Sequence, residues 1–267
     1  MCSADPKEWR SPKFNPDGTA RFFPGNTIIC HVPRPGSLED HLTEIRAMLT
    51  GAAESPAHAF LPASSWHMTI FEVMNFADRS KERWLPGLDL SADPHACHAE
   101  AARRLTAAAP WTPELFHMRA TGIAARRTGS LTIALEPIDP VETARIRGFR
   151  DRIASVLGIR RPDHDSYQFH ITLAYRVQPQ DDPAWERYAT AIARASNFAI
   201  ERLNDVRLGP AEFCRFESML AFDRLLYLGR QAGDSAPSWV SASMEEPGRR
   251  PLGPVGQSLG AIAAASR

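Results

Sequence analysis

The sequence lacks an excess of charge of either sign. Its 267 residues include 31 Lys plus Arg and 31 Asp plus Glu, so the formal net charge at pH 7 is zero with neutral histidines. Proteins that bind long nucleic acids usually carry an excess of positive charge over a broad surface, and this sequence has no such excess. The composition favours a compact anionic ligand that is held by a few local groups.

Cysteine pairs and long apolar runs are also missing. The four cysteines are scattered without C-x-x-C spacing, which indicates neither a zinc framework nor a disulfide framework and is typical of a reducing compartment. The one metal-like cluster, His95-Ala-Cys-His98, has no partner cluster, so we expect no metal and no cofactor. No apolar run approaches the roughly 18 residues of a membrane span, and the N-terminus is polar. We therefore expect a cytoplasmic protein without a membrane partner.

Two segments of the chain share the pattern His, apolar residue, Thr. The first lies in S-S-W-H-M-T-I-F-E-V, residues 64–73, and the second in Y-Q-F-H-I-T-L-A-Y, residues 167–175. Apolar residues alternate in both segments, which predicts strands, and residues two apart in a strand share a face. Each histidine is therefore expected beside its threonine on the open face of a strand. The candidate catalytic residues are His67, Thr69, His170 and Thr172.

The same alternation adds candidates for substrate binding. Phe71 is placed to stack on a base and Arg176 to pair with phosphate charge, although a core aromatic and a solvated strand-end arginine are the competing interpretations. Trp66 and Tyr175 fall on the opposite face and are expected in the core. The candidate substrate-binding residues are Ser65, Phe71, Gln168 and Arg176.

The order of predicted elements around the two motifs is repeated. A strand and a capped helix precede the first motif, and a hairpin and a helix precede the second, 170 − 67 = 103 residues further on. This order is what a duplication would leave, with one strand-helix-strand unit in each of two lobes. The expected divisions are an irregular N-terminal arm at 1–21, a bilobal domain at 22–230 with lobes at about 22–93 and 116–230, and a flexible tail at 231–267. The polar segment 75–90 is either a solvated loop or a cover for the groove.

Two imidazoles that flank one ligand can hold different protonation states near neutral pH. A neutral histidine then takes a proton from water or a hydroxyl, while a protonated one supplies a proton to the leaving oxygen at phosphorus. The threonine hydroxyls would donate hydrogen bonds to the non-bridging phosphate oxygens, where negative charge accumulates. This chemistry needs no metal.

The paired motifs resemble those of the 2H phosphoesterase superfamily, which includes the RNA 2′,3′-cyclic phosphodiesterases and the 2′-5′ RNA ligases. The strings L-P-A-S-S-W-H-M-T-I-F-E, F-H-I-T-L-A-Y and G-N-T-I-I-C-H look like an uncharacterised bacterial and fungal branch, over about residues 22–228. The resemblance implies an α+β fold of duplicated β-α-β units, whose antiparallel sheets form a central groove between two lobes. It also implies metal-independent hydrolysis or transfer at a phosphodiester, often a 2′,3′-cyclic end. By this resemblance, the catalytic roles known in the family are assigned only to the two histidines and two threonines of the motifs.

The expected activity is that of a phosphodiesterase acting on a small nucleotide or cyclic phosphate, because the balanced charge disfavours long RNA. Two alternatives remain open, a nucleotide- or phosphate-binding module without turnover and an RNA 2′-5′ ligase or phosphodiesterase that acts on an RNA end. A serine hydrolase is disfavoured because the sequence contains no G-x-S-x-G elbow. The motifs leave open which histidine is the base, the natural substrate, the direction of reaction and the oligomeric state.

Overall fold

A computed structural model describes residues 11–52, 57–112, 115–125 and 129–229 of the chain. The expected tail at 231–267, the first ten residues of the expected arm and most of the turn at 126–129 lie outside these ranges. The elements in chain order are β1 (Gly25–His31), α1 (Ser37–Thr50), β2 (His58–Phe60), η2 (Ala63–Ser65), β3 (His67–Asn75), η3 (Lys81–Arg83), α2 (Pro94–Ala107), β4 (Phe116–Ala125), β5 (Ser130–Pro137), α3 (Pro140–Leu157), β6 (Phe169–Arg176), α4 (Asp182–Arg202), β7 (Val206–Leu208), β8 (Ala211–Ser218) and β9 (Ala221–Leu228).

The helices begin where the sequence places capping residues. Asp93, Asp139 and Asp181 each accept a hydrogen bond from a backbone N–H of the first turn, and a proline follows within the first two helical positions. Helix α3 ends at Gly158, whose φ of 72° is favourable for glycine and strained for other residues. The two helices that were predicted before the two motifs are confirmed, as α1 and α3.

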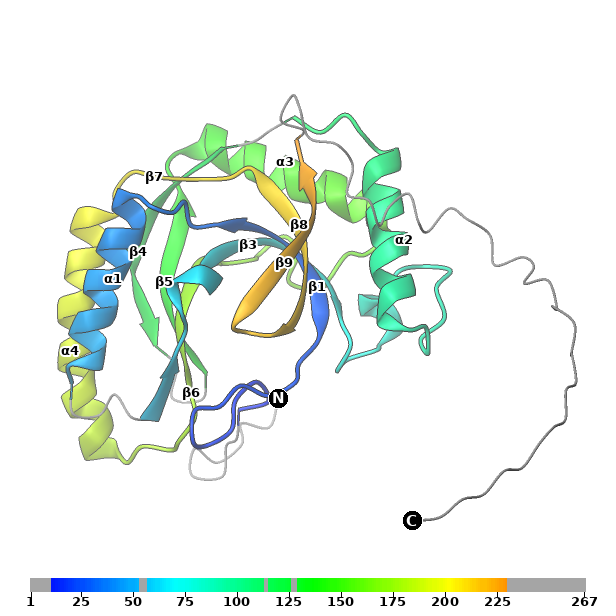
Figure 1. Cartoon of the computed structure of the whole chain (residues 1–267). Helices are drawn as coiled ribbons and strands as arrows, with labels where there is room; N and C mark the ends of the chain where they lie inside the picture. The colour runs from blue at the N-terminus through cyan, green and yellow to red at the C-terminus, as the bar shows by residue number, and fades with distance from the viewer. Residues whose placement is uncertain (1–10, 53–56, 113–114, 126–128, 230–267) are drawn as a thin grey trace, which may run out of the picture.

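The strands form one nine-stranded antiparallel sheet in the order β7-β4-β5-β6-β3-β1-β8-β9, with β2 on the same edge of β6 as β3. The α+β class with antiparallel strands is therefore confirmed, and the sheet curls into a half-barrel (Figure 1). Separate sheets were expected for two lobes. Instead β3 and β6 pair directly, at Met68 and Ile171. This contact joins the strands around β6 to the strands around β3 in a single sheet.

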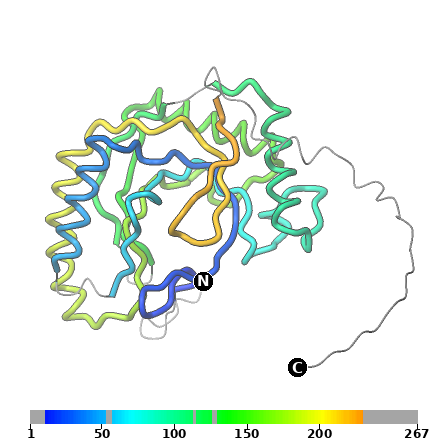
Figure 2. Tube along the Cα trace, viewed as in Figure 1, coloured from blue at the N-terminus to red at the C-terminus, as the bar shows by residue number. Residues whose placement is uncertain are grey.

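The helices cover the sheet in two pairs. Helix α1 lies along α4 (Figure 2). Helix α4 packs on β4, where the Ser196 hydroxyl accepts a hydrogen bond from the Ile123 backbone. Helices α2 and α3 contact each other, and α3 packs on β3, β4 and β5. The core between helices and strands includes the fully buried Leu42, Ile146, Ile171 and Tyr188.

Two segments that look irregular in the sequence are packed. In the N-terminal arm Phe14 is 3% exposed and stacks on Tyr175 of β6, with 5.3 Å between ring centroids. After β3, the Trp84 indole is buried and donates to the Asp89 carbonyl, while Arg79 donates to the Leu90 and Ala92 carbonyls. The arm therefore reaches the second motif strand, a contact that the sequence pattern does not indicate.

In the described part of the chain no helix has the length and apolarity to cross a bilayer.

A buried histidine in β2 makes the stability of the fold dependent on pH. His58 is 7% exposed and stacks on Tyr188, and burial, with the charge of Arg176, lowers its pKa from 6.5 to about 4. Because the folded state disfavours the charged form, this stability is complete above pH 6.5 and is lost as pH falls toward 4. The shift corresponds to about 3 kcal/mol.

Replacing this histidine by phenylalanine should therefore reduce the acid sensitivity of the protein. His58→Phe keeps the aromatic contact with Tyr188 and removes the titrating group. Between pH 7 and pH 4 the free energy of unfolding should therefore fall by up to about 3 kcal/mol less in the variant than in wild type. Urea unfolding at the two pH values measures the difference. The exposed His95, changed to phenylalanine, is the matched control, and equal losses in wild type and His58→Phe would contradict the prediction.

Candidate active site

The pairing of β3 with β6 brings the two H-x-T motifs together. Met68 is opposite Ile171, the pair at which β3 and β6 meet, so the His and Thr of each motif flank one cross-strand contact. Directly opposed residues have Cβ atoms about 5 Å apart, and diagonal neighbours such as the two histidines about 7–8 Å apart. That separation leaves room for a phosphate group between the two imidazoles.

The buried face of the two strands lies opposite the motif side chains. Trp66, Met68 and Ile171 are at most 1% exposed and pack in the core. His67 and His170 are half-buried on the other face. The expected arrangement of one polar face and one apolar face is therefore found at the motifs themselves.

Both motif histidines are held by the same backbone contact. The Nδ1 atom of His67 lies 2.7 Å from the Ser65 carbonyl oxygen, and Nδ1 of His170 lies 2.9 Å from the Gln168 carbonyl oxygen. Since a carbonyl oxygen only accepts hydrogen bonds, each Nδ1 carries a proton, and a neutral ring keeps its lone pair on Nε2. Each imidazole thus presents Nε2 for proton transfer.

The surroundings of His67 hold it in the neutral form. Burial lowers its pKa from 6.5 to about 3, the positive charges of His31, His170 and Lys13 add to this effect, and the bond to the Ser65 carbonyl opposes it. A lowered pKa suits a group that accepts a proton. The two motifs, equivalent in sequence, therefore differ in environment.

That difference comes from residues that the sequence pattern does not single out. His31 of β1 is the strand partner of His67, with ring centroids 6.4 Å apart, and its Nδ1 lies 3.2 Å from Oε1 of Glu212 in β8. The corresponding partner of His170 on β5 is Ala134. Phe222 of β9 packs edge-on against His67, with 4.2 Å between centroids. These neighbours come from strands β1, β8 and β9, whose positions only the tertiary structure defines.

Further polar groups reach the motifs from outside the strands. Lys13 of the arm donates to the Tyr175 hydroxyl over 3.2 Å, and its charge acts on His67. Tyr167, just before β6, shares a hydrogen bond with the Thr69 hydroxyl, and burial raises the pKa of its phenol. Its ring lies 6.2 Å from that of His170. A lysine and two tyrosines therefore adjoin the motif face.

A β-bulge follows each motif and changes which side chains face the site. On β3, Ile29 pairs with Thr69 and Ile28 with Phe71, so Ile70 is an extra residue. On β6, Leu131 pairs with Ala174 and Thr132 with Thr172, so Leu173 is extra. An extra residue reverses the alternation of faces beyond it. Simple alternation of side chains between the two faces therefore predicts the correct face within each motif and the wrong face after it.

The two bulges account for the positions of the outer candidates. Phe71 is 2% exposed and contacts the His164 ring, and Arg176 is 1% exposed, donating to the carbonyls of Gln178 and Gln180. Both side chains lie in the interior, so we leave them out of the proposed site. Tyr175, expected in the core, is instead half-buried beside Lys13.

The remaining two candidates contribute through their backbones. Ser65 is fully buried, and its hydroxyl donates to the Pro62 carbonyl. Gln168 is exposed, with its side-chain amide donating to the Ser166 carbonyl. The carbonyl oxygens of both residues orient the motif histidines, a role that side-chain parity does not predict.

Two groups of side chains within the described ranges have the spacing of metal ligands. One is His31, Glu212 and Cys214, beside His67, and the other is Asp151, His164 and Asp165. An arginine already contacts a carboxylate in each group, Arg224 at Glu212 and Arg160 at both aspartates. A cation would be repelled by these guanidinium groups, so neither donor set fits a metal well. In the H-A-C-H cluster, His98 is hydrogen-bonded to Asn26.

Comparison with known proteins gives a partial family match. The model of a family described as "2H-phosphodiest: Domain of unknown function (DUF1868)" matches residues 13–129, just under half of the chain, including the first motif. Over these residues the chain is similar to a 2H-phosphodiesterase family. No curated protein matches the chain.

Solved structures extend the similarity along the chain. A conserved protein of unknown function from Agrobacterium tumefaciens, ATU0111, is 26% identical, with a TM-score of 0.75 over 85% of this chain and 94% of that one. TT0787 of Thermus thermophilus is 14% identical, with a TM-score of 0.40 over 77% of this chain and 99% of that one. The first match supports the fold over most of the chain, and its printed description assigns no activity.

Proposed function

We propose that the chain is a metal-independent phosphodiesterase that acts on a small nucleotide or cyclic phosphate of the 2′,3′ type. The observation that carries the proposal is the opposed pair of motifs, in which both imidazoles are bonded through Nδ1 and present Nε2 on one face of β3 and β6. The partial match to a 2H-phosphodiesterase family agrees with it. The two strand-helix-strand units are then the lobes of a duplicated fold, with the substrate groove along the β3–β6 contact.

The lowered pKa of His67 favours it as the base and His170 as the acid. Nε2 of His67 takes a proton from water as the water oxygen attacks phosphorus. The bond from phosphorus to the 2′ or 3′ oxygen breaks, and Nε2–H of His170 protonates that leaving oxygen. The product is a phosphate monoester, and Thr69 and Thr172 donate hydrogen bonds to the non-bridging oxygens in the transition state.

The proposal is tested by hydrolysis of a panel of 2′,3′-cyclic nucleotides in excess EDTA. Wild type should turn over at least one member at the same rate with and without EDTA, because the imidazoles supply all the proton transfers. The double variant His67→Ala, His170→Ala should be inactive on the same member. Loss of wild-type activity in EDTA would overturn the metal-free mechanism, and activity in the double variant would place catalysis elsewhere.

A further inference from the structure

A lysine of the N-terminal arm reaches the strand of the second motif. The Nζ atom of Lys13 donates to the Tyr175 hydroxyl of β6 over 3.2 Å. The bulge at Leu173 turns the Tyr175 side chain to the same face of β6 as Thr172, because an extra residue reverses the alternation of faces. The ammonium group of Lys13 is therefore anchored on the face of the sheet that carries the two motifs.

Lys13 lies at the end of this face that carries His67. Strands β3 and β6 run antiparallel and meet at Met68 and Ile171, so the later part of β6, which includes Tyr175, lies toward the start of β3. His67 is the first residue of β3. The positive charge of Lys13 contributes to the lowered pKa of this histidine, which agrees with the position of both groups at one end of the site.

Aromatic side chains hold the lysine in this position. Its ammonium group lies 4.8 Å from the centroid of the Tyr175 ring and 5.3 Å from that of the Phe23 ring. The next residue, Phe14, is 3% exposed and stacks on Tyr175, and the Arg21 backbone N–H donates to the Lys13 carbonyl. A side chain held in this way loses little conformational freedom when a ligand binds. The arm therefore presents a preorganised cation.

The charge of Lys13 is not neutralised by an acid among the residues that the structure describes. Its ammonium group makes one hydrogen bond within these residues, to Tyr175, and no carboxylate of these residues pairs with it. The nearby Asp17 of the arm is bonded to the hydroxyl and the backbone N–H of Thr19 instead. An ammonium group has three N–H donors. Two donors and a full positive charge are therefore left, in the described part of the chain, for an anion on the motif face.

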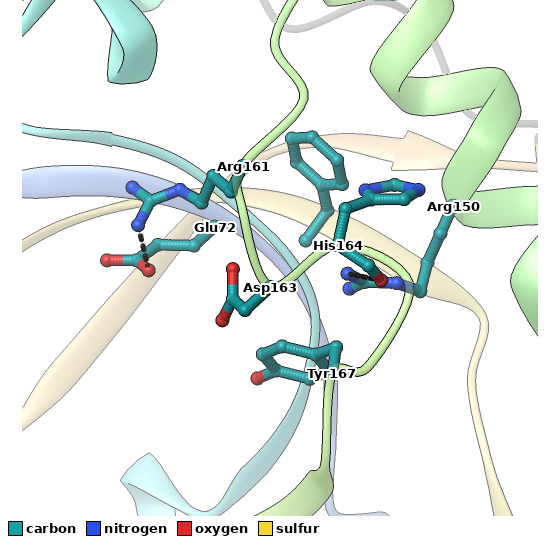
Figure 3. Close-up of a pocket in the computed structure, with 7 residues that line it drawn as sticks. Glu72, Arg150, Arg161, Asp163, His164 and Tyr167 are labelled. Carbon is teal, nitrogen blue, oxygen red and sulfur yellow. Dashed lines mark hydrogen bonds and ion pairs between the residues drawn. The ribbon is translucent and has the colours of Figure 1, made fainter.

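Two arginines near the motif strands do not offer their charge in the same way. Arg150 and Arg161 line a pocket between β3, α3 and the segment that connects α3 to β6 (Figure 3). The free volume of this pocket is about 10 Å³, room for about one water molecule and too little for a phosphate. Arg161 is bonded to Glu72, and Arg150 donates to two backbone carbonyls. Lys13 is therefore better placed than these arginines to contact a phosphate at the motifs.

We infer that Lys13 binds the reacting phosphate, with its ammonium group donating to a non-bridging oxygen on the side of His67. The inference rests on the proposed function for the identity of this phosphate, and it adds a catalytic residue that lies outside both motifs. Negative charge on the non-bridging oxygens increases as water attacks phosphorus, so a fixed cation beside them stabilises the transition state more than the bound substrate. Lys13 gives up no proton, and the two imidazoles still carry out both proton transfers.

The test replaces the lysine by residues that keep its packing. Lys13→Met keeps an unbranched side chain against the rings of Phe23 and Tyr175 and removes the charge. For a 2′,3′-cyclic nucleotide, kcat/KM should fall about 10²-fold, the usual effect of removing one group that stabilises an oxyanion, with most of the loss in kcat. Lys13→Arg keeps the charge and should restore most of the lost activity. Thermal unfolding of the same preparations shows whether the arm stays packed.

Arg21→Met is the matched control, because this arginine is an exposed cation of the same arm and donates to the Ser11 carbonyl. It should leave kcat/KM unchanged. Equal kcat/KM in wild type and in folded Lys13→Met would overturn the inference while the proposed function stands. A loss in Lys13→Met that Lys13→Arg does not restore would overturn it as well, since packing and not charge would then explain the loss.

Binding of inorganic phosphate, followed by calorimetry, separates failure of this inference from failure of the proposed function. If wild type hydrolyses no cyclic nucleotide, phosphate should still bind about tenfold more weakly to Lys13→Met than to wild type, because a charged hydrogen bond is lost. Arg21→Met should bind phosphate as wild type does. This result would support the anion contact of Lys13 without the enzyme activity. Absence of binding to wild type, or equal affinity in wild type and Lys13→Met, would overturn the inference.

Discussion

Replacing either motif histidine by alanine is expected to lower turnover of a 2′,3′-cyclic nucleotide by about 10² to 10⁴-fold, the usual contribution of a general acid or base. His67→Ala removes the proposed proton acceptor and His170→Ala the proposed donor. Each change leaves the strand backbone and its buried face intact, so thermal unfolding should shift little. Steady-state kinetics and unfolding curves on the same preparations measure both effects.

The control for this experiment is another strand histidine. His117 lies in β4, bonded to Asp205 through its Nε2 atom, and the β3–β6 contact does not include it. His117→Ala should retain near-normal activity. The double variant of His67 and His170 lacks both the acid and the base, so it should show no turnover above the background rate. Near-normal activity in either single variant would remove that histidine from the mechanism.

Activity is expected to depend on pH as a bell whose acid limb lies well below the pKa of a free imidazole. Burial lowers the pKa of His67 to about 3, so this base stays neutral, and competent, as pH falls from 7 toward 4. Below that range its protonation should reduce kcat/KM about tenfold per pH unit. The alkaline limb should appear where the acid, His170, loses its proton. A profile of kcat/KM from pH 3 to 9, with circular dichroism at each pH, measures both limbs.

Variants assign the two limbs. The positive charge of His31 contributes to the lowered pKa of His67, so His31→Gln should move the acid limb upward by up to about one pH unit. Residual activity of His67→Ala should lack the acid limb, and that of His170→Ala should lack the alkaline limb. An exchange of these two outcomes would reverse the assignment of base and acid, and a flat wild-type profile would exclude a pair of imidazoles.

Local patterns predicted the elements of this fold well, because each pattern has a local physical cause. Capping residues indicated the helices before the two motifs, α1 and α3, and alternating apolar residues marked β3 and β6. One short strand, β2 (His58–Phe60), was missed, since three residues are too few to show a period. The N-terminal arm was read as irregular because its prolines hide the contact of Phe14 with Tyr175.

Predictions of the site were accurate only over short distances along a strand. Within each motif, His and Thr share a face because strand alternation is strict over three residues. Beyond the motifs, the bulges at Ile70 and Leu173 reversed the alternation. No simple sequence signal marks these bulges, since both residues are ordinary β-branched or aliphatic strand residues. Simple alternation therefore placed Phe71 and Arg176 on the open face and Tyr175 in the core, whereas in the structure Phe71 and Arg176 are buried and Tyr175 is half-buried.

The sequence by itself determined the α+β class, the helices that precede the two motifs and the two H-x-T pairs, because caps, periodicity and adjacent residues act over a few positions. Only the tertiary structure decided that β3 pairs with β6, that His31 and Lys13 approach His67, and that Arg150 and Arg161 share a pocket with Tyr167. These contacts join residues that are far apart in the chain. They depend on strand order, register and bulges, which follow from packing of the whole sheet and not from any local stretch of sequence.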